Sequence, residues 1–267
     1  MFSRHDWDGS PQRDQVYGPR FTARSTLLRR MLGRVRPRSV LDIGCGSGTI
    51  TRHVADYSGH VHAIDVSPKA IEVAQENLAG SRKVTFESID VFGCSEEARS
   101  HLAEKHDVIV LSEVLEHLDD DETALRIVRS LLPPGGYLVL TVPGDPHQWS
   151  IDDDLSGHKR RYTKPELILK LTRAGFRVER ITNWGFPFTR LLVSVERRLM
   201  ASQQGQNALP MMLRTLLRPI SLLFRLNGII EPLFSFVDAG IGYVVLAKAS
   251  ESTRHSAEKP RPASRVA

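Results

Sequence analysis

The 267-residue sequence has few cysteines, few aromatic residues and no long apolar run. Its two cysteines, Cys45 and Cys94, cannot build a disulfide framework, which favours a reducing compartment. No stretch approaches the roughly 18 consecutive apolar residues of a membrane-spanning helix. The charged N-terminus lacks the apolar segment of a signal peptide. We therefore expect a cytoplasmic protein.

Nucleic acid is not an expected partner, although the net charge is +5. The sequence has no run of aromatic residues interleaved with basic ones, and no recognisable RNA-binding module. Part of the positive charge lies in the last residues, 249–267, whose Ser, Pro, Ala and Arg content is typical of a disordered tail. With 41% hydrophobic residues, the rest of the chain can form a full core without disulfides or a structural metal.

Short aliphatic runs alternate with segments of helical period, which predicts a parallel sheet with helices on both faces. The expected strands are Ser39–Ile43, Val61–Val66, Val84–Ile89, Val108–Leu111, Tyr137–Val142, Phe176–Thr182 and Ile241–Lys248, and the expected helices are Phe21–Val35, Pro68–Leu78, Glu122–Leu132 and Lys164–Ala174. Gly175 is the expected cap of the last of these helices. Residues from Pro143 to Arg161 are expected to form a loop.

Five regions follow from this pattern. Residues 1–37 form an N-terminal cap region, 38–183 an α/β core, 184–238 an inserted apolar helical module, 239–248 the last core strand and 249–267 the tail. The insertion is rich in Leu, Phe and Met and is broken by four prolines. This composition is typical of several short helices.

A glycine-rich turn follows the first expected strand, in the string Val40-Leu-Asp-Ile-Gly-Cys-Gly-Ser-Gly48. Glycines 44, 46 and 48 carry no side chain, so a ligand can lie against the backbone. In the dinucleotide motif G-x-G-x-x-G the third glycine comes one residue later, at the position that Thr49 occupies here. The carboxylate of Asp42, just before the turn, suits a cationic ligand better than a pyrophosphate.

Two further aspartates end the next two strands. Asp65 lies 21 residues after Gly44, the spacing at which an acid usually binds ribose hydroxyls. Asp90 ends the third strand and could accept a hydrogen bond from an adenine amino group. Because the carboxyl ends of parallel strands share one edge of the sheet, we expect all three aspartates to lie there.

These motifs resemble those of class I S-adenosylmethionine-dependent methyltransferases, over roughly Arg36 to Thr182 and again at the last strand. The resemblance implies a Rossmann-like, seven-stranded, mostly parallel sheet whose last strand is antiparallel. It also implies S-adenosyl-L-methionine as cofactor. The residues expected to contact it are Asp42, Gly44, Cys45, Gly46, Gly48, Asp65, Val66, Asp90, Val91 and Ser112.

The string Leu111-Ser-Glu-Val-Leu-Glu-His-Leu118 follows the fourth strand. Glu113, Glu116 and His117 have i, i+3, i+4 spacing, which places them on one face of a helical turn. His158 could reach the same pocket from the later loop. These four residues could hold Mg²⁺ or a softer divalent ion. Alternatively, Glu116, His117 and His158 act as catalytic groups that take a proton from an oxygen acceptor.

The Glu-Val-x-Glu-His string is similar to that of two metal-using branches of the superfamily. One is the ubiquinone-biosynthesis O-methyltransferases, within the methyltransferase type 11/12/23 group. The other is the small-RNA 3′-terminal 2′-O-methyltransferases, in which a later histidine completes the metal site, a role that would fall to His158. Close variants of the string also occur in relatives without a metal, where these residues only line the pocket.

Two other features bear on the acceptor. Lys159, Arg160 and Arg161 form a basic cluster that either faces solvent or recognises an acidic acceptor. Leu209 to Phe236 combines apolar residues with arginines at helical spacing, as in helices that lie on membranes. The same segment could instead pack on the domain, form a dimer interface or cover the acceptor pocket.

The leading hypothesis is O-methylation of a small lipophilic or phenolic acceptor, with or without a divalent metal. The alternatives are a metal-free N- or C-methyltransferase of secondary metabolism or glycan modification, an RNA 2′-O-methyltransferase, and a non-catalytic cofactor-binding protein. The sequence leaves open whether the protein is a monomer or a homodimer.

Overall fold

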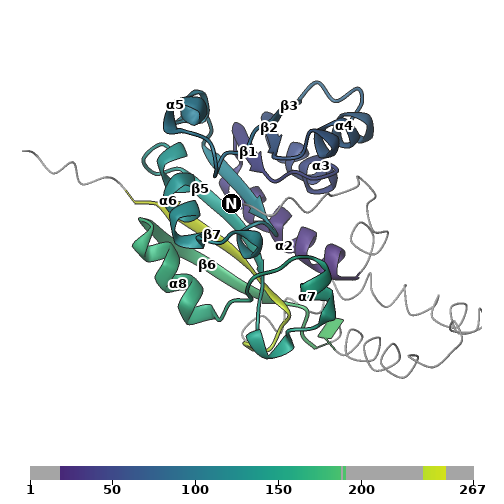
Figure 1. Ribbon diagram of the computed structural model, residues 1–267, viewed down its shortest axis with the longest axis vertical. Helices are drawn as coiled ribbons and strands as arrows, with labels where there is room; N and C mark the ends of the chain where they lie inside the picture. The colour runs from purple at the N-terminus through teal and green to yellow at the C-terminus, as the bar shows by residue number, and fades with distance from the viewer. Residues whose placement is uncertain (1–18, 188, 191–236, 251–267) are drawn as a thin grey trace, which may run out of the picture.

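The computed structural model describes residues 19–187, 189, 190 and 237–250. These residues form a seven-stranded sheet in the order β3-β2-β1-β4-β5-β7-β6 (Figure 1). Only β7 runs antiparallel to its neighbours β5 and β6. The expected fold class is therefore confirmed, while residues 191–236 and the tail 251–267 lie outside the described residues, including most of the expected apolar insertion.

The strands agree closely with the aliphatic runs. They are β1 (Ser39–Ile43), β2 (His60–Asp65), β3 (Val84–Ser88), β4 (Val108–Ser112), β5 (Tyr137–Pro143), β6 (Phe176–Trp184) and β7 (Gly242–Ala249). Trp184, the expected first residue of the insertion, is thus the last residue of β6. The central strands β1, β4 and β5 are buried almost throughout, because helices cover both faces of the parallel part.

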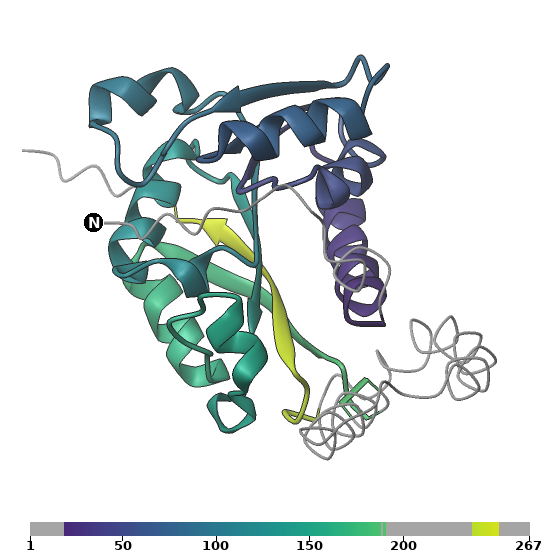
Figure 2. The same ribbon diagram turned by 45° about the vertical axis from the view of Figure 1, so that its right-hand side comes forward.

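Helices cover both faces of the sheet, as Figure 2 shows. The helices α2 (Pro19–Val35), α3 (Thr49–Ala55) and α4 (Pro68–Asn77) pack on one face, and α6 (Asp121–Leu131) and α8 (Lys164–Arg173) on the other. A four-residue helix, α5 (Glu96–Arg99), and the 3₁₀ turn η1 (Ser100–Leu102) precede β4. Gly175 ends α8 with a φ of +88°, as expected for its cap.

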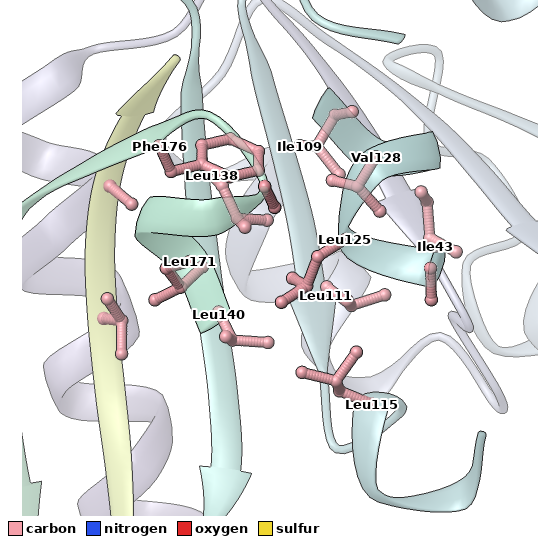
Figure 3. Packing of buried hydrophobic residues seen from close by; sticks show 14 of the residues in the cluster. Ile43, Ile109, Leu111, Leu115, Leu125, Val128, Leu138, Leu140, Leu171 and Phe176 are labelled. Atoms are coloured by element: carbon pink, nitrogen blue, oxygen red, sulfur yellow. The ribbon is translucent and has the colours of Figure 1, made fainter. Parts of the chain in front are cut away.

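The core between the sheet and α6 and α8 extends to the carboxyl end of β4 (Figure 3). Leu115, in the 3₁₀ turn η2 (Leu115–His117), is fully buried in this core beside Leu111 and Leu125. Burial of such a side chain contributes about 1.5–3 kcal/mol. The turn that carries Glu116 and His117 is therefore held on the sheet by its own apolar residue.

The segment between β5 and α8 is not a simple loop. It contains a 3₁₀ turn, η3 (Pro146–Gln148), and a short helix, α7 (Ile151–Leu155). A bridge between Gly144 and Tyr162 closes it at its base. At the start of α7, the Asp153 carboxylate accepts a hydrogen bond from the backbone N–H of Ser150. The expectation of a loop failed because local capping contacts stabilise a helix too short to show periodicity.

Within the described ranges, no helix is both long and apolar enough to cross a membrane.

Candidate functional site

The glycine turn joins β1 to α3 at the carboxyl edge of the sheet. Gly44, Gly46 and Gly48 all have positive φ, of 74°, 53° and 77°. A Cβ on Gly44 would lie 2.4 Å from the Val114 side chain, and one on Gly48 would lie 2.8 Å from Leu78. A Cβ on Gly46 would meet no atom within 4 Å. The backbone at Gly46 therefore borders open space in which a ligand can lie.

Asp42 lies under this turn and is almost fully buried, with 1% exposure. Its Oδ2 accepts a hydrogen bond of 2.7 Å from the Thr51 hydroxyl. Burial raises the pKa of Asp42 to about 6, because the hydrogen bond from Thr51 only partly offsets the loss of water. A carboxylate in this environment is stabilised when a cation binds next to it.

Asp65 is the last residue of β2, as expected, whereas Asp90 lies two residues after the end of β3. Asp65 accepts hydrogen bonds from the backbone N–H groups of Gly46 and Ser67, each 2.9 Å long. Burial raises its pKa in spite of these bonds. Asp90 accepts a hydrogen bond from the backbone of Gly93, 2.9 Å long. Both carboxylates therefore also shape the turns in which they lie.

The other residues expected at the cofactor lie along the same edge in different environments. Cys45 and Val91 are buried, whereas Val66 is 63% exposed directly after β2. The Ser112 hydroxyl lies 2.9 Å from that of Thr141 on β5. Burial and the neighbouring Asp42 raise the pKa of the Cys45 thiol, so it stays protonated.

Glu113 does not share a helical face with Glu116 and His117. It precedes the turn η2 and has a φ of +55°, so the regular i, i+3, i+4 geometry fails. Its carboxylate pairs instead with Arg24 of α2, at 3.0 Å, and accepts a hydrogen bond from Thr141, at 2.9 Å. The expected four-residue group is therefore reduced to three.

Glu116, His117 and His158 do come together. One potential ligand atom from each lies within 4.8 Å of the other two. The imidazole rings of His117 and His158 meet edge to face, with centroids 4.9 Å apart. His158 Nε2 is 3.9 Å from Glu116 Oε1, which is longer than a hydrogen bond. The geometry thus joins two imidazoles and one carboxyl group from segments about forty residues apart.

The Glu116 side chain is fully buried, yet neither of its oxygens has a hydrogen-bond partner among the described residues. Burial is the main cause, and the nearby charge of Glu113 the second, that raises the pKa of Glu116 well above its ordinary value. An unpartnered buried carboxyl group costs about 1–3 kcal/mol or more. Such groups are concentrated at functional sites, since binding of a ligand can offset the cost.

The basic cluster is neither a solvated loop nor a free anion site. Lys159 pairs with Asp119, and Arg160 lies 3.0 Å from Asp121. Arg161 pairs with the buried Asp153 at 2.8 Å. Each cation is therefore matched by a carboxylate, and the three pairs fasten the segment before α8 to the residues between η2 and α6, to α6 and to α7. This removes the argument that the cluster selects an acidic acceptor.

Two residues at this site escaped the sequence analysis. Arg24, from α2, reaches Glu113 and has a buried Nε without a hydrogen-bond partner. Asp153, from α7, accepts a hydrogen bond of 2.9 Å from His158 Nδ1. Arg24 belongs to no motif, because only the packing of α2 brings it to Glu113. Asp153 lies five residues before His158 and belongs to a Ser150-x-x-Asp153 capping box. The capping-box spacing and the acidic run Asp152-Asp-Asp154 were the sequence signals for Asp153.

Comparison with known sequences gives a consistent picture. The family model described as a methyltransferase domain matches residues 18–181, more than half of the chain. A ubiquinone biosynthesis O-methyltransferase from Bordetella avium is 30% identical over 112 residues, 42% of this chain and 45% of that protein. A malonyl-[acyl-carrier protein] O-methyltransferase from Halalkalibacterium halodurans is 33% identical over 119 residues, 44% of this chain and 43% of that protein. The chain thus spans about half the length of these relatives.

Solved structures share the fold at low sequence identity. The N-methyltransferase NodS from Bradyrhizobium japonicum, in complex with S-adenosyl-l-homocysteine, has a TM-score of 0.57 at 20% identity, covering 90% of this chain and 91% of that one. The [4+2]-cyclase SpnF has a TM-score of 0.58 at 20% identity, covering 86% and 81%. Since a cyclase shares the architecture, the fold alone does not determine the reaction.

The sheet order, the glycine turn and the family match agree with the resemblance found in the sequence. This chain belongs to the methyltransferase-domain family, within the class I S-adenosylmethionine-dependent methyltransferases.

Proposed function

We propose that this protein transfers a methyl group from S-adenosyl-L-methionine to an oxygen atom of a small lipophilic or phenolic acceptor. The observation that carries the proposal is the group formed by Glu116 and His117, in the turn after β4, and His158, from the segment between α7 and α8. The turn follows β4 at the sheet edge that also bears the glycine turn. An oxygen acceptor must lose a proton during transfer, and a carboxyl group with two imidazoles can take it. The named O-methyltransferase relatives support the same class of reaction.

The chain's own residues would have two tasks. Gly46 and the strand-end aspartates Asp42, Asp65 and Asp90 would bind and orient the cofactor. Glu116, His117 and His158 would border the acceptor and receive its proton. When bound, S-adenosyl-L-methionine supplies an activated methyl group, so that the protein contributes mainly alignment.

Affinity for the cofactor should fall as the pH drops below 6, because the raised pKa of Asp42 makes its carboxylate protonate there. The direction and size of this change follow from linkage between protonation and binding. The ionised Asp42 carboxylate favours the cationic ligand, so each further pH unit below 6 lowers the affinity by up to about tenfold. Calorimetric titrations between pH 5 and pH 8 would measure this.

In Asp42→Asn the affinity should be lower at pH 8, and the drop below pH 6 should shrink. An equally steep drop in the variant would refute the role of Asp42.

The same three residues fit a divalent cation. Glu116 offers a buried carboxylate without a hydrogen-bond partner, and the histidines offer imidazole nitrogens. Because Glu113 is paired with Arg24, the remaining ligands are one carboxylate and two imidazole nitrogens. Mg²⁺ prefers oxygen ligands, so this ligand set suits Zn²⁺, Mn²⁺ or Fe²⁺ better. When bound, such an ion would lower the pKa of an acceptor hydroxyl. We include this ion in the proposal as an aid to proton removal.

The direct experiment uses the full chain, labelled S-adenosyl-L-methionine and a panel of phenols, carboxylic acids and amines. We expect transfer to phenols, a loss of at least tenfold after exhaustive chelation, and better recovery with Mn²⁺ or Zn²⁺ than with Mg²⁺. Unchanged turnover after chelation would exclude the ion. Transfer only to amines would favour the metal-free N-methyltransferase instead.

Other expectations remain predictions. They are the apolar nature of the acceptor, the cytoplasmic location, the choice between monomer and homodimer, and membrane-surface association through 209–236, a segment outside the described residues.

A further inference from the structure

Asp153 lies beside His158 and is almost fully buried, with 1% exposure. Among the described residues, its carboxylate oxygens form hydrogen bonds with donors or with groups able to donate. Oδ1 accepts from Arg161 Nε at 2.8 Å and lies 2.9 Å from His158 Nδ1. Oδ2 accepts from Arg161 Nη2 at 3.0 Å, from the Ser150 backbone N–H at 2.8 Å and from its hydroxyl at 3.1 Å.

This arrangement keeps Asp153 ionised. Both of its oxygens accept hydrogen bonds from the Arg161 guanidinium, a group that is always charged and that has donors but no acceptor. Because Oδ1 then carries no proton, the proton between it and His158 must reside on Nδ1 of the imidazole. A neutral imidazole has a single N–H, so Nε2 keeps its lone pair.

That lone pair lies on the side of the ring facing Glu116, whose Oε1 is 3.9 Å from Nε2. The His158 ring cannot turn freely, since it packs edge to face on His117 and its backbone N–H bonds the Asp153 carbonyl at 2.9 Å. Arg161 in turn donates from Nη1 to the Gly144 carbonyl at 3.0 Å. Asp153 is thereby fixed to the end of β5.

We propose that Asp153 is the positioning residue of the acceptor side, holding His158 in its Nδ1–H tautomer with the Nε2 lone pair directed toward Glu116 and His117. This inference rests on the proposed function in one respect: the Nε2 lone pair is useful because both proton removal and cation binding require it. The tautomer itself does not depend on any activity. An orienting carboxylate of this kind typically changes ligand affinity or turnover by 10–100-fold.

The test is Asp153→Asn, whose amide cannot satisfy all the donors around it. With its oxygen toward Arg161 Nη2 and Ser150, the new NH₂ group faces His158 Nδ1, which must then act as acceptor. We expect the His158 tautomer to switch to Nε2–H, seen in long-range ¹⁵N–¹H spectra at alkaline pH and assigned with His158→Gln. Turnover should fall at least tenfold, while affinity for S-adenosyl-L-methionine stays within about twofold.

Arg161→Lys is the matched control. It removes the two-pronged contact with Asp153 and should lower the melting temperature, yet leave the Nδ1–H tautomer unchanged. An Nε2–H tautomer in the wild-type protein would overturn the proposal, even where Asp153→Asn fails to fold. So would an unchanged tautomer in folded Asp153→Asn. A tautomer switch in a protein that methylates no acceptor would support Asp153 as the positioning residue and refute the proposed function instead.

Discussion

Gly46→Ala should lower the affinity for S-adenosyl-L-methionine at least tenfold, about 1.4 kcal/mol, in a protein that still folds. The new methyl group would meet no protein atom within 4 Å, so it would enter only the space in which we place the cofactor. The backbone φ of +53° costs an alanine about 1–2 kcal/mol. In a chain of this size, that corresponds to a fall of roughly 2–8 °C in melting temperature.

Gly80→Ala is the matched control, measured by the same calorimetry and thermal unfolding. Gly80 also has positive φ, +88°, and open space around its missing Cβ, but it lies in the turn after α4. It should show the backbone cost without the loss of affinity. Gly44→Ala is less informative, because its Cβ would overlap the Val114 side chain at 2.4 Å. Wild-type affinity in Gly46→Ala would mean that the cofactor does not lie against this turn.

Glu116→Gln should become more stable relative to wild type as the pH rises, and yet lose activity. The pKa of Glu116 is raised in the folded protein by burial and by Glu113. Between its ordinary value and this raised one, the folded chain binds a proton that the unfolded chain does not, so wild-type stability decreases with increasing pH. Glutamine cannot ionise and escapes this loss. Turnover should fall at least tenfold, since the carboxylate is gone.

Thermal unfolding of the metal-free proteins from pH 4.5 to pH 8 would measure the effect. The melting temperature of Glu116→Gln minus that of wild type should increase over this range by at least about 3 °C, the equivalent of roughly 1 kcal/mol. Glu76→Gln, an exposed site on α4, controls for the change in charge and should alter stability by no more than about 0.5 kcal/mol. A difference for Glu116→Gln that is flat with pH would contradict the raised pKa.

Glu113 does not join the predicted site, which shows that residue spacing alone does not predict which side chains lie together here. The i, i+3, i+4 rule holds only inside a regular helix. Here the chain leaves β4 through a residue with φ of +55° and forms a single 3₁₀ turn. Leu115 fixes that turn on the core, so Glu116 and His117 point together while Glu113 turns to Arg24. The deviation is made by tertiary packing, which a periodic pattern does not encode.

Local sequence alone determined the strands, most of the longer helices and the glycine turn of this protein. Aliphatic runs, caps and glycines act within a few residues of one another, so their consequences can be read along the chain. Only the tertiary structure decided that His158 faces Glu116, that Asp153 and Arg161 fix it, and that Arg24 binds Glu113. The contacts of His158 with Glu116 and of Arg24 with Glu113 join segments that are distant in sequence. Asp153, His158 and Arg161 are near in sequence, but their segment has no periodic pattern and takes its place only once the sheet has packed against the helices.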